Sequence, residues 1–438
     1  MAVVLEQEVK KDEYVAGFDE AAFRALANEA ETSALRELRE LRFDEYRAVP
    51  LPTKKMEEWR RTDPARFPFD RMKRLPTIPR GVCAPHDWDE LFDVVVSVED
   101  AAFDIQDRGG VLGDGKVLVV PLEEALREHA DRIRPFLEKR ARAEAPDKYE
   151  VLGDAFWNVG LFIHIAPGVD LKRGILLRYR QSGAGGILIP RILVAVGERS
   201  NAVLVESMES PDGVEMMSVV SREFHVAEGA KLHSTTLRTW GDRTVHLAGD
   251  WARIGRDARL EWITLNFGGR LTKVRFGSDG AAPGANAELD GLFFASDEQH
   301  VDQKTLQVHS SPDTYSRLLY KGVAKDKAYS VYQGQIIARP GAIRVDAYQR
   351  NNNLVLNDGA RADSMPGLQI DADDLKCSHG STVGNLDEDE IFYLRCRGID
   401  EGTARKTLIR GFFEDVTGRI PHECVRKVVH SQVDAKIG

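Results

Sequence analysis

The sequence predicts a mainly β protein, in which stacked β-coils (a β-helix) lie between helical N-terminal and C-terminal domains. Between about residues 156 and 377, helical periodicity gives way to short alternating strands. Small-residue turns recur in this region and begin at Glu228, Arg256 and Pro283, 28 and 27 residues apart. Repeats of this period are typical of stacked coils. About 220 residues of strand also exceed the roughly 100 residues of a β-sandwich.

Residues 1–150 are expected to form a mostly helical domain. From Asp19, a plausible N-cap, apolar residues recur at intervals of three and four as far as Leu41. Residues 117–120 are predicted to be a strand and residues 122–137 a helix. The basic stretch 52–63 is interpreted, on composition alone, as a linker anchored by Trp59.

Residues 151–383 are expected to form the β core. Strands are predicted at 175–179, 192–196, 202–205, 223–226, 259–265, 305–308, 335–338 and 353–356. The recurrent turns, at 228–232, 256–260, 283–287, 325–329 and 357–361, contain Gly or Asp with Ala. This composition suits a coil corner, which needs positive φ followed by a small side chain. The glycine-rich residues 183–186 are interpreted as a turn because no helix follows them to hold a phosphate.

Residues 384–438 are expected to form a C-terminal helical domain docked on the end of the β core. Asp387 is a predicted N-cap, and Gly398 stands where a helix C′ glycine is expected. A second helix is predicted from Asp400 and a third after Pro421. Helical caps of this kind protect the open edges of a β stack.

Composition narrows the class of protein. The 438 residues include 60 Lys and Arg against 70 Asp and Glu, a net charge of −10 that argues against a nucleic-acid binder. Hydrophobic residues make up 42% and charged residues 30%, as in soluble globular proteins. Apolar runs stop at about five residues, so no membrane span is expected. No secretory signal is recognised, and four cysteines without a CxxC pair predict a cytoplasmic protein.

The sequence contains no zinc-protease, hydrolase-elbow, Walker or dinucleotide-binding motif. It does contain one dense group of residues that could carry chemistry. Residues 376–384 read Lys-Cys-Ser-His-Gly-Ser-Thr-Val-Gly. Cys377 and His379 project to the same face of an extended segment, where both could bind one soft metal ion. Two ligands are at most half a site. From spacing alone, a strand end with a buried thiol and a backbone-bonded histidine is the favoured alternative.

These residues also carry a resemblance. The stretch 371–384, continued by 389–395 (Asp-Glu-Ile-Phe-Tyr-Leu-Arg), 397–399 and 408–413, closely resembles the SufB/SufD family of iron–sulfur cluster assembly scaffolds. Residues 52–63 and 155–169 look like the N-terminal element and the start of the β core in that family. The resemblance covers nearly the whole chain beyond about residue 50.

Within the family, the sequence is most like SufD. SufB-like chains carry a cysteine about where Asn352 stands and a glutamate directly after the histidine, where this chain has Gly380. The Asn-rich strand and the Cys377/His379 pair match the SufD pattern instead. A SufB-type member that itself holds the cluster remains the alternative within the family. A polysaccharide-active β-helix enzyme is the alternative of another class, although the acidic residues gather mainly in turns and helix starts.

The resemblance implies a right-handed parallel β-helix and a non-catalytic scaffold subunit. It implies pairing with a SufB-like subunit through the β-helix and docking of a SufC-like ATPase on the C-terminal helices, so that ATP is used only by the partner. It also implies that His379 and Cys377 help to hold a transient iron–sulfur cluster at the SufB interface, where the partner supplies the missing ligands. The anchors proposed for the ATPase are Ile391, Phe392, Phe412 and Phe413. No nucleic-acid or membrane partner is expected, and self-pairing of the isolated chain is left open.

Overall fold

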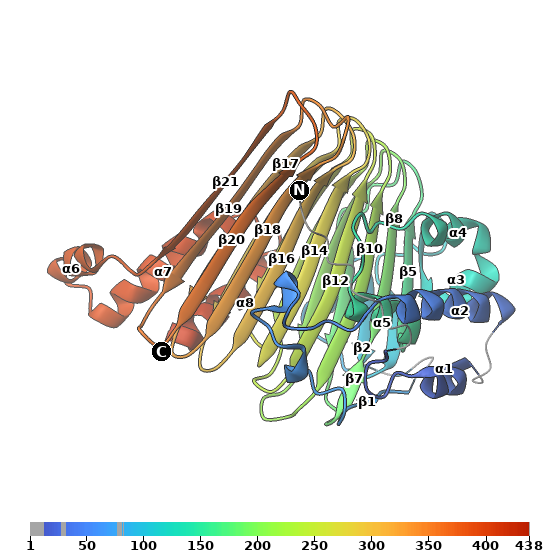
Figure 1. The fold of residues 1–438 in the computed structure, drawn as a ribbon, viewed down its shortest axis with the longest axis horizontal. Coiled ribbons are helices and arrows are strands. Elements are labelled where there is room, and N and C mark those ends of the chain that lie inside the picture. Colours follow the sequence, from blue (N-terminus) through green and yellow to red (C-terminus); the bar gives the residue numbers. More distant parts are fainter. Residues whose placement is uncertain (1–12, 28–31, 77–80, 82, 438) are drawn as a thin grey trace.

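The core of the molecule is a stack of two-stranded coils (Figure 1). The computed structural model describes residues 13–27, 32–76, 81 and 83–437. From β8 onward, successive strands alternate between two sheets, and every neighbouring pair within a sheet is parallel. The main path of sheet A consists of β4 (Val117–Pro121), β5 (Val159–Ile165), β8 (Pro190–Val196), β10 (Met217–Val226), β12 (Val245–Ile254), β14 (Leu271–Gly280), β16 (His300–His309), β18 (Tyr329–Ala338) and β20 (Arg361–Ile370). Sheet B consists of β3 (Ala102–Asp107), β2 (Val94–Glu99), β6 (Ile175–Arg180), β9 (Asn201–Glu209), β11 (Lys231–Thr239), β13 (Arg259–Asn266), β15 (Asn286–Ala295), β17 (Tyr315–Ala324), β19 (Asp346–Val355) and β21 (Lys376–Gly384).

Turn chemistry explains the regular stacking. Gly229, Asp257, Gly284 and Asp326 lie in four of the five predicted turns, and all four have positive φ. Glycine adopts this conformation without strain, and aspartate tolerates it better than most residues. Each turn therefore returns the chain to the other sheet at the same height, and the next coil pairs in register with the one before. The predicted mainly β fold, a parallel β-helix between helical ends, is confirmed.

The N-terminal part is less helical than expected. Its helices are α1 (Glu20–Ala27), α2 (Ser33–Ala48), α3 (Leu122–Glu128), α4 (Ala130–Glu138) and α5 (Lys148–Phe156). The single periodic run expected from Asp19 appears as α1 and α2, and residues 28–31 lie outside the described residues. The strands β2, β3 and β4 extend the two sheets, and β1 (Lys73–Arg74) pairs with β7 (Gly186–Leu188). The strands within residues 94–121 therefore belong to the two sheets, while the division into domains at 150 and 383 stays a prediction.

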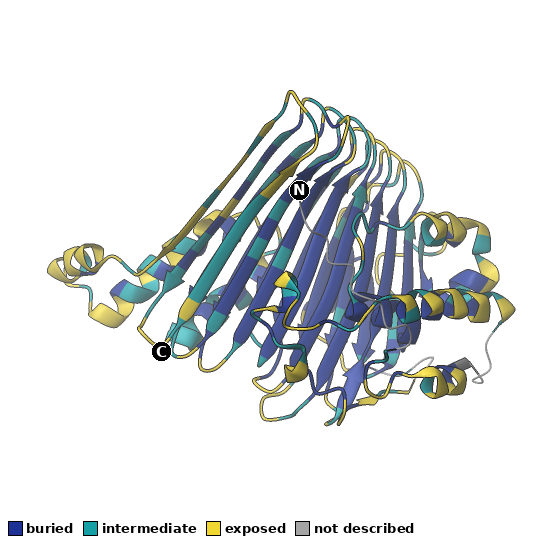
Figure 2. Cartoon of the chain, viewed as in Figure 1, coloured by how far each residue is buried: buried dark blue, intermediate teal, exposed yellow. Residues whose placement is uncertain are grey.

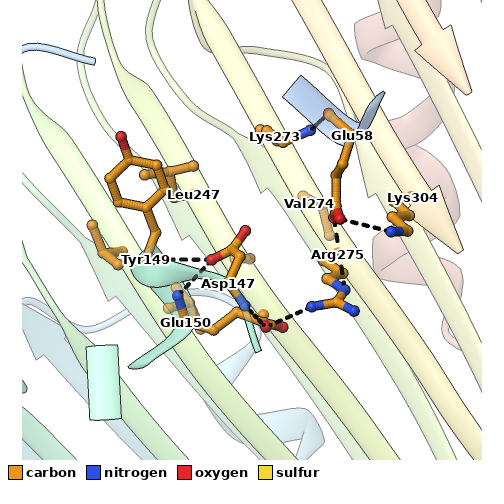
Figure 3. A pocket seen from close by; sticks show the side chains of 13 residues that line it. Glu58, Asp147, Tyr149, Glu150, Leu247, Lys273, Val274, Arg275 and Lys304 are labelled. Carbon is orange, nitrogen blue, oxygen red and sulfur yellow. Dashed lines mark hydrogen bonds and ion pairs between the residues drawn. The ribbon is translucent and has the colours of Figure 1, made fainter. Parts of the chain in front are cut away.

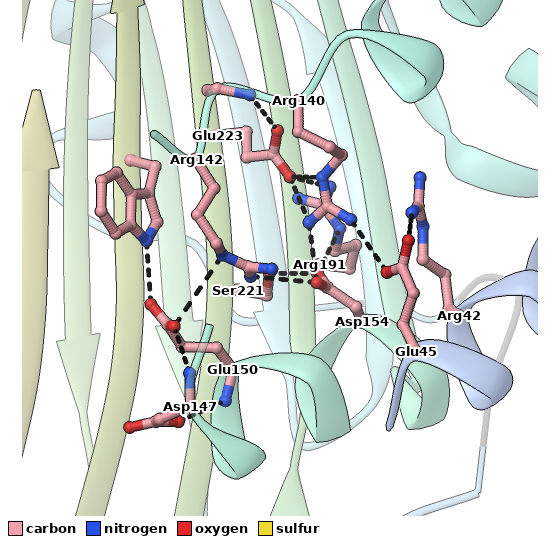
Figure 4. A network of polar contacts seen from close by, with 12 residues as sticks. Arg42, Glu45, Arg140, Arg142, Asp147, Glu150, Asp154, Arg191, Ser221 and Glu223 are labelled. Carbon is pink, nitrogen blue, oxygen red and sulfur yellow. Dashed lines mark hydrogen bonds and ion pairs between the residues drawn. The ribbon is translucent and has the colours of Figure 1, made fainter. Parts of the chain in front are cut away.

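A buried ionic network joins the N-terminal part to the outer face of sheet A (Figure 4). Arg140 contacts Asp154 at 2.7 Å and Glu223 at 2.5 Å, and Arg191 contacts Glu223 at 2.7 Å. Burial opposes ionisation of Asp154, but the surrounding guanidinium groups outweigh it and hold the pKa of this carboxyl well below its usual range. Such paired charges fix the position of α5 on the sheet.

The stretch 52–63 crosses sheet A as a strap. Trp59 is buried against Phe67 and Tyr149, so its predicted anchoring role is confirmed. Beside it, Glu58 lines a small pocket and contacts Lys304 at 2.7 Å and Arg275 at 3.7 Å (Figure 3). Burial alone would raise the pKa of Glu58, but these cations lower it. The strap is therefore held by charge as well as by its tryptophan.

The C-terminal helices are α6 (Glu388–Cys396), α7 (Glu401–Thr417) and α8 (Glu423–Ile437). Asp387, the predicted N-cap, and Asp400, the predicted start of the second helix, each accept a hydrogen bond from a backbone N–H of the helix that follows, and Gly398 has positive φ. Residues of α7 and α8 share a hydrophobic cluster with sheet B, whereas α6 projects away from the core (Figure 1). Among the described residues, no helix is long and apolar enough to cross a membrane.

Candidate functional site

The last coil leaves both sheets open. Among the described residues, β20 pairs only with β18 along its length and β21 only with β19, so each presents one edge without a strand partner. Exposure rises toward this end of the stack (Figure 2). Leu368, Ile370 and Val383 lie there among the large apolar side chains that are exposed. Free strand edges of this kind are templates for pairing with another chain.

Cys377 and His379 lie on β21, at this open end. In the parallel register Cys377 is paired with Ala347 and His379 with Gln349, and both of these β19 residues are buried. Side chains alternate along a strand, so Cys377 and His379 share the face that points between the two sheets. The predicted common face of the pair is therefore confirmed, while their role as ligands stays a prediction.

The two side chains differ in availability. Cys377 is half-buried and packs against the cluster of Ile336, Ala342, Val345 and Ala347. Burial, reinforced by the charge of Asp346, raises the pKa of its thiol, which therefore stays protonated at neutral pH. His379 is exposed and makes no hydrogen bond to any residue that the structure describes. The backbone-bonded histidine of the alternative interpretation is thus not observed.

A hydrogen-bonded series of polar side chains holds the open strands together. Ser381 Oγ on β21 donates to Ser364 Oγ on β20 at 2.7 Å, and Ser364 donates to Asn351 Oδ1 on β19 at 2.6 Å. Asn353 Nδ2 donates to the same oxygen at 2.7 Å. In the sequence, only the Asn-rich strand indicates this series. Ser364 and Ser381 join it through contacts between different strands, which the local sequence does not predict.

The two positions that separate SufB-like from SufD-like sequences lie on the other face. Asn352 and Gly380 each stand one residue away from an inward-facing position, so they face outward from sheet B. A Cβ at Gly380 would lie 3.4 Å from the hydroxyl oxygen of Tyr348. A glutamate there would therefore extend over the outer face of sheet B and away from Cys377.

Cys377 and His379 are the two candidate ligands that the described residues place here. Within the described residues, no group of three or more His, Cys, Asp or Glu side chains is arranged to hold a metal ion. Zinc and iron–sulfur sites commonly use four protein ligands. A metal group held by Cys377 and His379 would therefore need ligands from outside the described residues.

The C-terminal helices present only part of the predicted anchor set. Ile391 and Phe413 are buried, and Phe412 is half-buried against Phe413 and Lys321. As docking residues, Ile391 and Phe413 are thus not accessible in this structure, because their side chains pack within the fold. Phe392 is 66% exposed on α6, and so is its neighbour Tyr393, at 57%. Sequence reasoning missed Tyr393, although it follows Phe392 directly.

Fold and site together define a class of protein: a parallel β-helix with helical ends, whose last coil has free strand edges and carries Cys377 and His379 on one face. The model of the family described as SUF system FeS cluster assembly, SufBD core domain, matches residues 179–412. This match covers more than half of the chain. The chain therefore belongs to the SufBD family of the iron–sulfur cluster assembly system.

Curated relatives agree with this placement. A SufBD family protein of Mycobacterium tuberculosis is 35% identical over 263 residues, which cover 58% of this chain and 65% of the relative. The chloroplastic protein ABCI7 of Arabidopsis thaliana is 29% identical over 298 residues, 64% of this chain and 62% of that protein. The cluster assembly protein SufB of Bacillus subtilis is 24% identical over 339 residues, 76% of this chain and 71% of its own length. The chain thus spans slightly less than two thirds of the first two relatives.

Proposed function

We propose that this protein is a SufD-like, non-catalytic scaffold subunit that helps to form and hand over a nascent iron–sulfur cluster. One observation carries the proposal: Cys377 and His379 share the inward face of the last strand, at an open end of the stack. An incomplete ligand pair at a pairing edge suits a labile cluster completed by a second chain. Family membership supplies the system in which such a cluster is made.

The second chain would be a SufB-like subunit. The free edges of β20 and β21 offer backbone N–H and C=O groups to its strands, and Leu368, Ile370 and Val383 offer apolar area. Self-pairing of the isolated chain would use the same surface. The cytoplasmic location expected from the sequence belongs to this proposal.

His379 would be the principal ligand of the cluster. Its imidazole is exposed and unengaged by the described residues, whereas the Cys377 thiol is half-buried and has a raised pKa. Since a thiol binds metal as the thiolate, Cys377 must lose its proton before it can contribute. We therefore rank His379 above Cys377.

The ATPase subunit would dock on the C-terminal helices, and only that subunit would bind and use ATP. Phe392 and Tyr393 are large, exposed and adjacent on α6, and the helix projects from the body of the molecule. Exposed aromatic side chains of this kind are typical anchors of protein interfaces. Phe412 would contribute its exposed part.

A SufB-type role is the second candidate, favoured by the alignment with the Bacillus subtilis SufB protein over 76% of this chain. Asn352 and Gly380, which replace the SufB-like cysteine and glutamate, count against it. Stable reconstitution of a cluster on this chain alone would support it. The alternative of a polysaccharide-active enzyme gains no support from the matched family, which is described by cluster assembly.

The test is cluster transfer to an apo-acceptor protein by the complex reconstituted with SufB-like and SufC-like subunits. We expect His379→Ala to leave folding and assembly intact and to abolish transfer. Ser378→Ala is the matched control, because Ser378 is exposed, adjacent and on the opposite face of β21. Normal transfer by the His379→Ala complex would contradict the ligand assignment. Failure of the chain to bind either partner under reducing conditions would contradict the scaffold role.

A further inference from the structure

Gln349 on β19 is an unusual buried residue. Its side chain is fully buried, and neither its amide nitrogen nor its amide oxygen has a hydrogen-bond partner among the described residues. Leaving such a group unpaired is costly, so proteins nearly always satisfy it. The position next to the last strand therefore calls for a partner.

The surroundings of Gln349 leave one neighbour in its ladder to supply that partner. Below it in register lies Leu318 on β17, which is apolar and buried. Above it in register lies His379 on β21. Parallel strands are about 4.8 Å apart, so side chains at paired positions on one face stack directly on each other.

The opposite sheet is shaped to admit the carboxamide. A Cβ at Gly334 on β18 would collide with Gln349 Nε2 and with the hydroxyl oxygen of Tyr332. The absence of a side chain at 334 therefore makes room for the amide. The Tyr332 hydroxyl hydrogen-bonds with Thr305 Oγ1 at 2.8 Å, and the imidazole of His379 is the polar side chain directly above Gln349 in the ladder.

We propose that Gln349 is the positioning residue of His379. Its carboxamide oxygen accepts a hydrogen bond from one ring N–H, and the other ring nitrogen then presents its lone pair at the open edge. The bond requires rotation about side-chain torsions, because both amide atoms of Gln349 are unpaired in this structure. In metal sites, the second hydrogen bond of a histidine fixes its tautomer and orientation in the same way. The role of this bond in metal binding rests on the proposed function, whereas the hydrogen bond itself does not.

The test uses the full-length chain with 13C-labelled histidine, and the His379 signal is assigned by its loss in His379→Gln. At a pH where the ring is neutral, we expect one of its two tautomers to dominate in the wild type. The chemical shifts of the ring carbons report the ratio of the two tautomers. Gln349→Met keeps the length of the side chain and removes the acceptor, so the tautomer ratio should shift by about fivefold, the factor that corresponds to one hydrogen bond. Gly334→Ala keeps Gln349 but displaces its amide, and should shift the ratio in the same direction.

Gln303→Met is the matched control. Gln303 is also buried and has an unpaired amide oxygen, but in the ladder it lies between Val274 and Tyr332. The proposal would be overturned if Gln349→Met and Gly334→Ala shift the tautomer ratio of His379 no more than Gln303→Met does. If Gln349→Met fails to fold, Gly334→Ala alone decides. Normal cluster transfer by His379→Ala would instead contradict the proposed function and leave the tautomer result standing.

Discussion

Lys321 Nζ on β17 lies 2.5 Å from Asp415 Oδ2 on α7 and 2.6 Å from the backbone oxygen of Phe412. The lysine is nearly buried, and its ammonium also lies over the Phe412 ring. These contacts attach the C-terminal helices to the outer face of sheet B. The attachment matters because α6, the proposed docking helix, packs against α7, and α7 packs against β15 and β17.

Loss of this attachment should loosen α7. We expect Lys321→Met, which keeps the apolar stem, to lower the free energy of unfolding by about 1–3 kcal/mol, as for hydrogen bonds to a charged group. Hydrogen exchange across residues 401–417 should accelerate in the same variant. Lys427→Met is the control, because the Lys427–Glu423 pair is exposed and such pairs contribute about 0–1 kcal/mol. Equal effects of the two changes would show that the Lys321 contacts do not hold the helix.

Phe392 should contribute to ATPase binding without contributing to folding. Its side chain is mostly exposed, so Phe392→Ser should leave the melting temperature unchanged while it weakens ATPase affinity by about tenfold or more, as at an interface hot spot. Isothermal titration calorimetry with the ATPase measures this loss. Leu91→Ser, also at an exposed apolar position but outside the C-terminal helices, should bind normally. If Phe392→Ser binds the ATPase as tightly as the wild type, Phe392 is not part of the docking surface.

Charge at the open end should prevent pairing. Leu368→Lys combined with Val383→Lys places two cations where a partner strand would bury apolar area, so binding of the SufB-like subunit, and any self-pairing, should fall by at least about tenfold. Light scattering and co-purification measure these two associations. Leu41→Lys, on the exposed face of α2, is the matched control. If the double variant still assembles normally, the edge is not the interface.

His309 should make stability depend on pH. Burial lowers the pKa of its imidazole to about 4 from the usual 6.5, and its ring nitrogens contact Thr314 Oγ1 and Ser316 Oγ. As pH falls below 6.5, the unfolded chain takes up the proton first, so the free energy of unfolding decreases until about pH 4. Between pH 7 and pH 5 this one group accounts for about 2 kcal/mol.

The measurement is chemical denaturation at both pH values. His309→Gln cannot be protonated, so its loss of stability on going from pH 7 to pH 5 should be smaller than that of the wild type. His430→Gln, on the partly exposed surface of α8, should keep the wild-type dependence. An unchanged dependence in His309→Gln would mean that the imidazole is not buried neutral in the fold.

Local sequence was sufficient for the coils and their corners. Gly229 and Asp257 mark turns because a coil corner needs positive φ, and this requirement is met by the residue itself and not by its surroundings. Asp387 and Asp400 likewise indicate where their helices begin, because an N-cap side chain accepts a hydrogen bond from a backbone N–H two or three residues later. The common face of Cys377 and His379 follows from the two-residue period of a strand.

Tertiary structure decided which of these residues are accessible and what they touch. Nothing in the local sequence separates buried Ile391 from exposed Phe392, because their exposure depends on where α6 sits relative to its neighbours. Gln349 and His379 are 30 positions apart, and only the register of β19 with β21 stacks them. The repeating β-helix, the helical ends and the common face of the Cys/His pair could be predicted from the sequence, because these features depend on short-range geometry. The open end, the buried glutamine beneath His379 and the strap over sheet A required the fold, because each depends on contacts between distant segments.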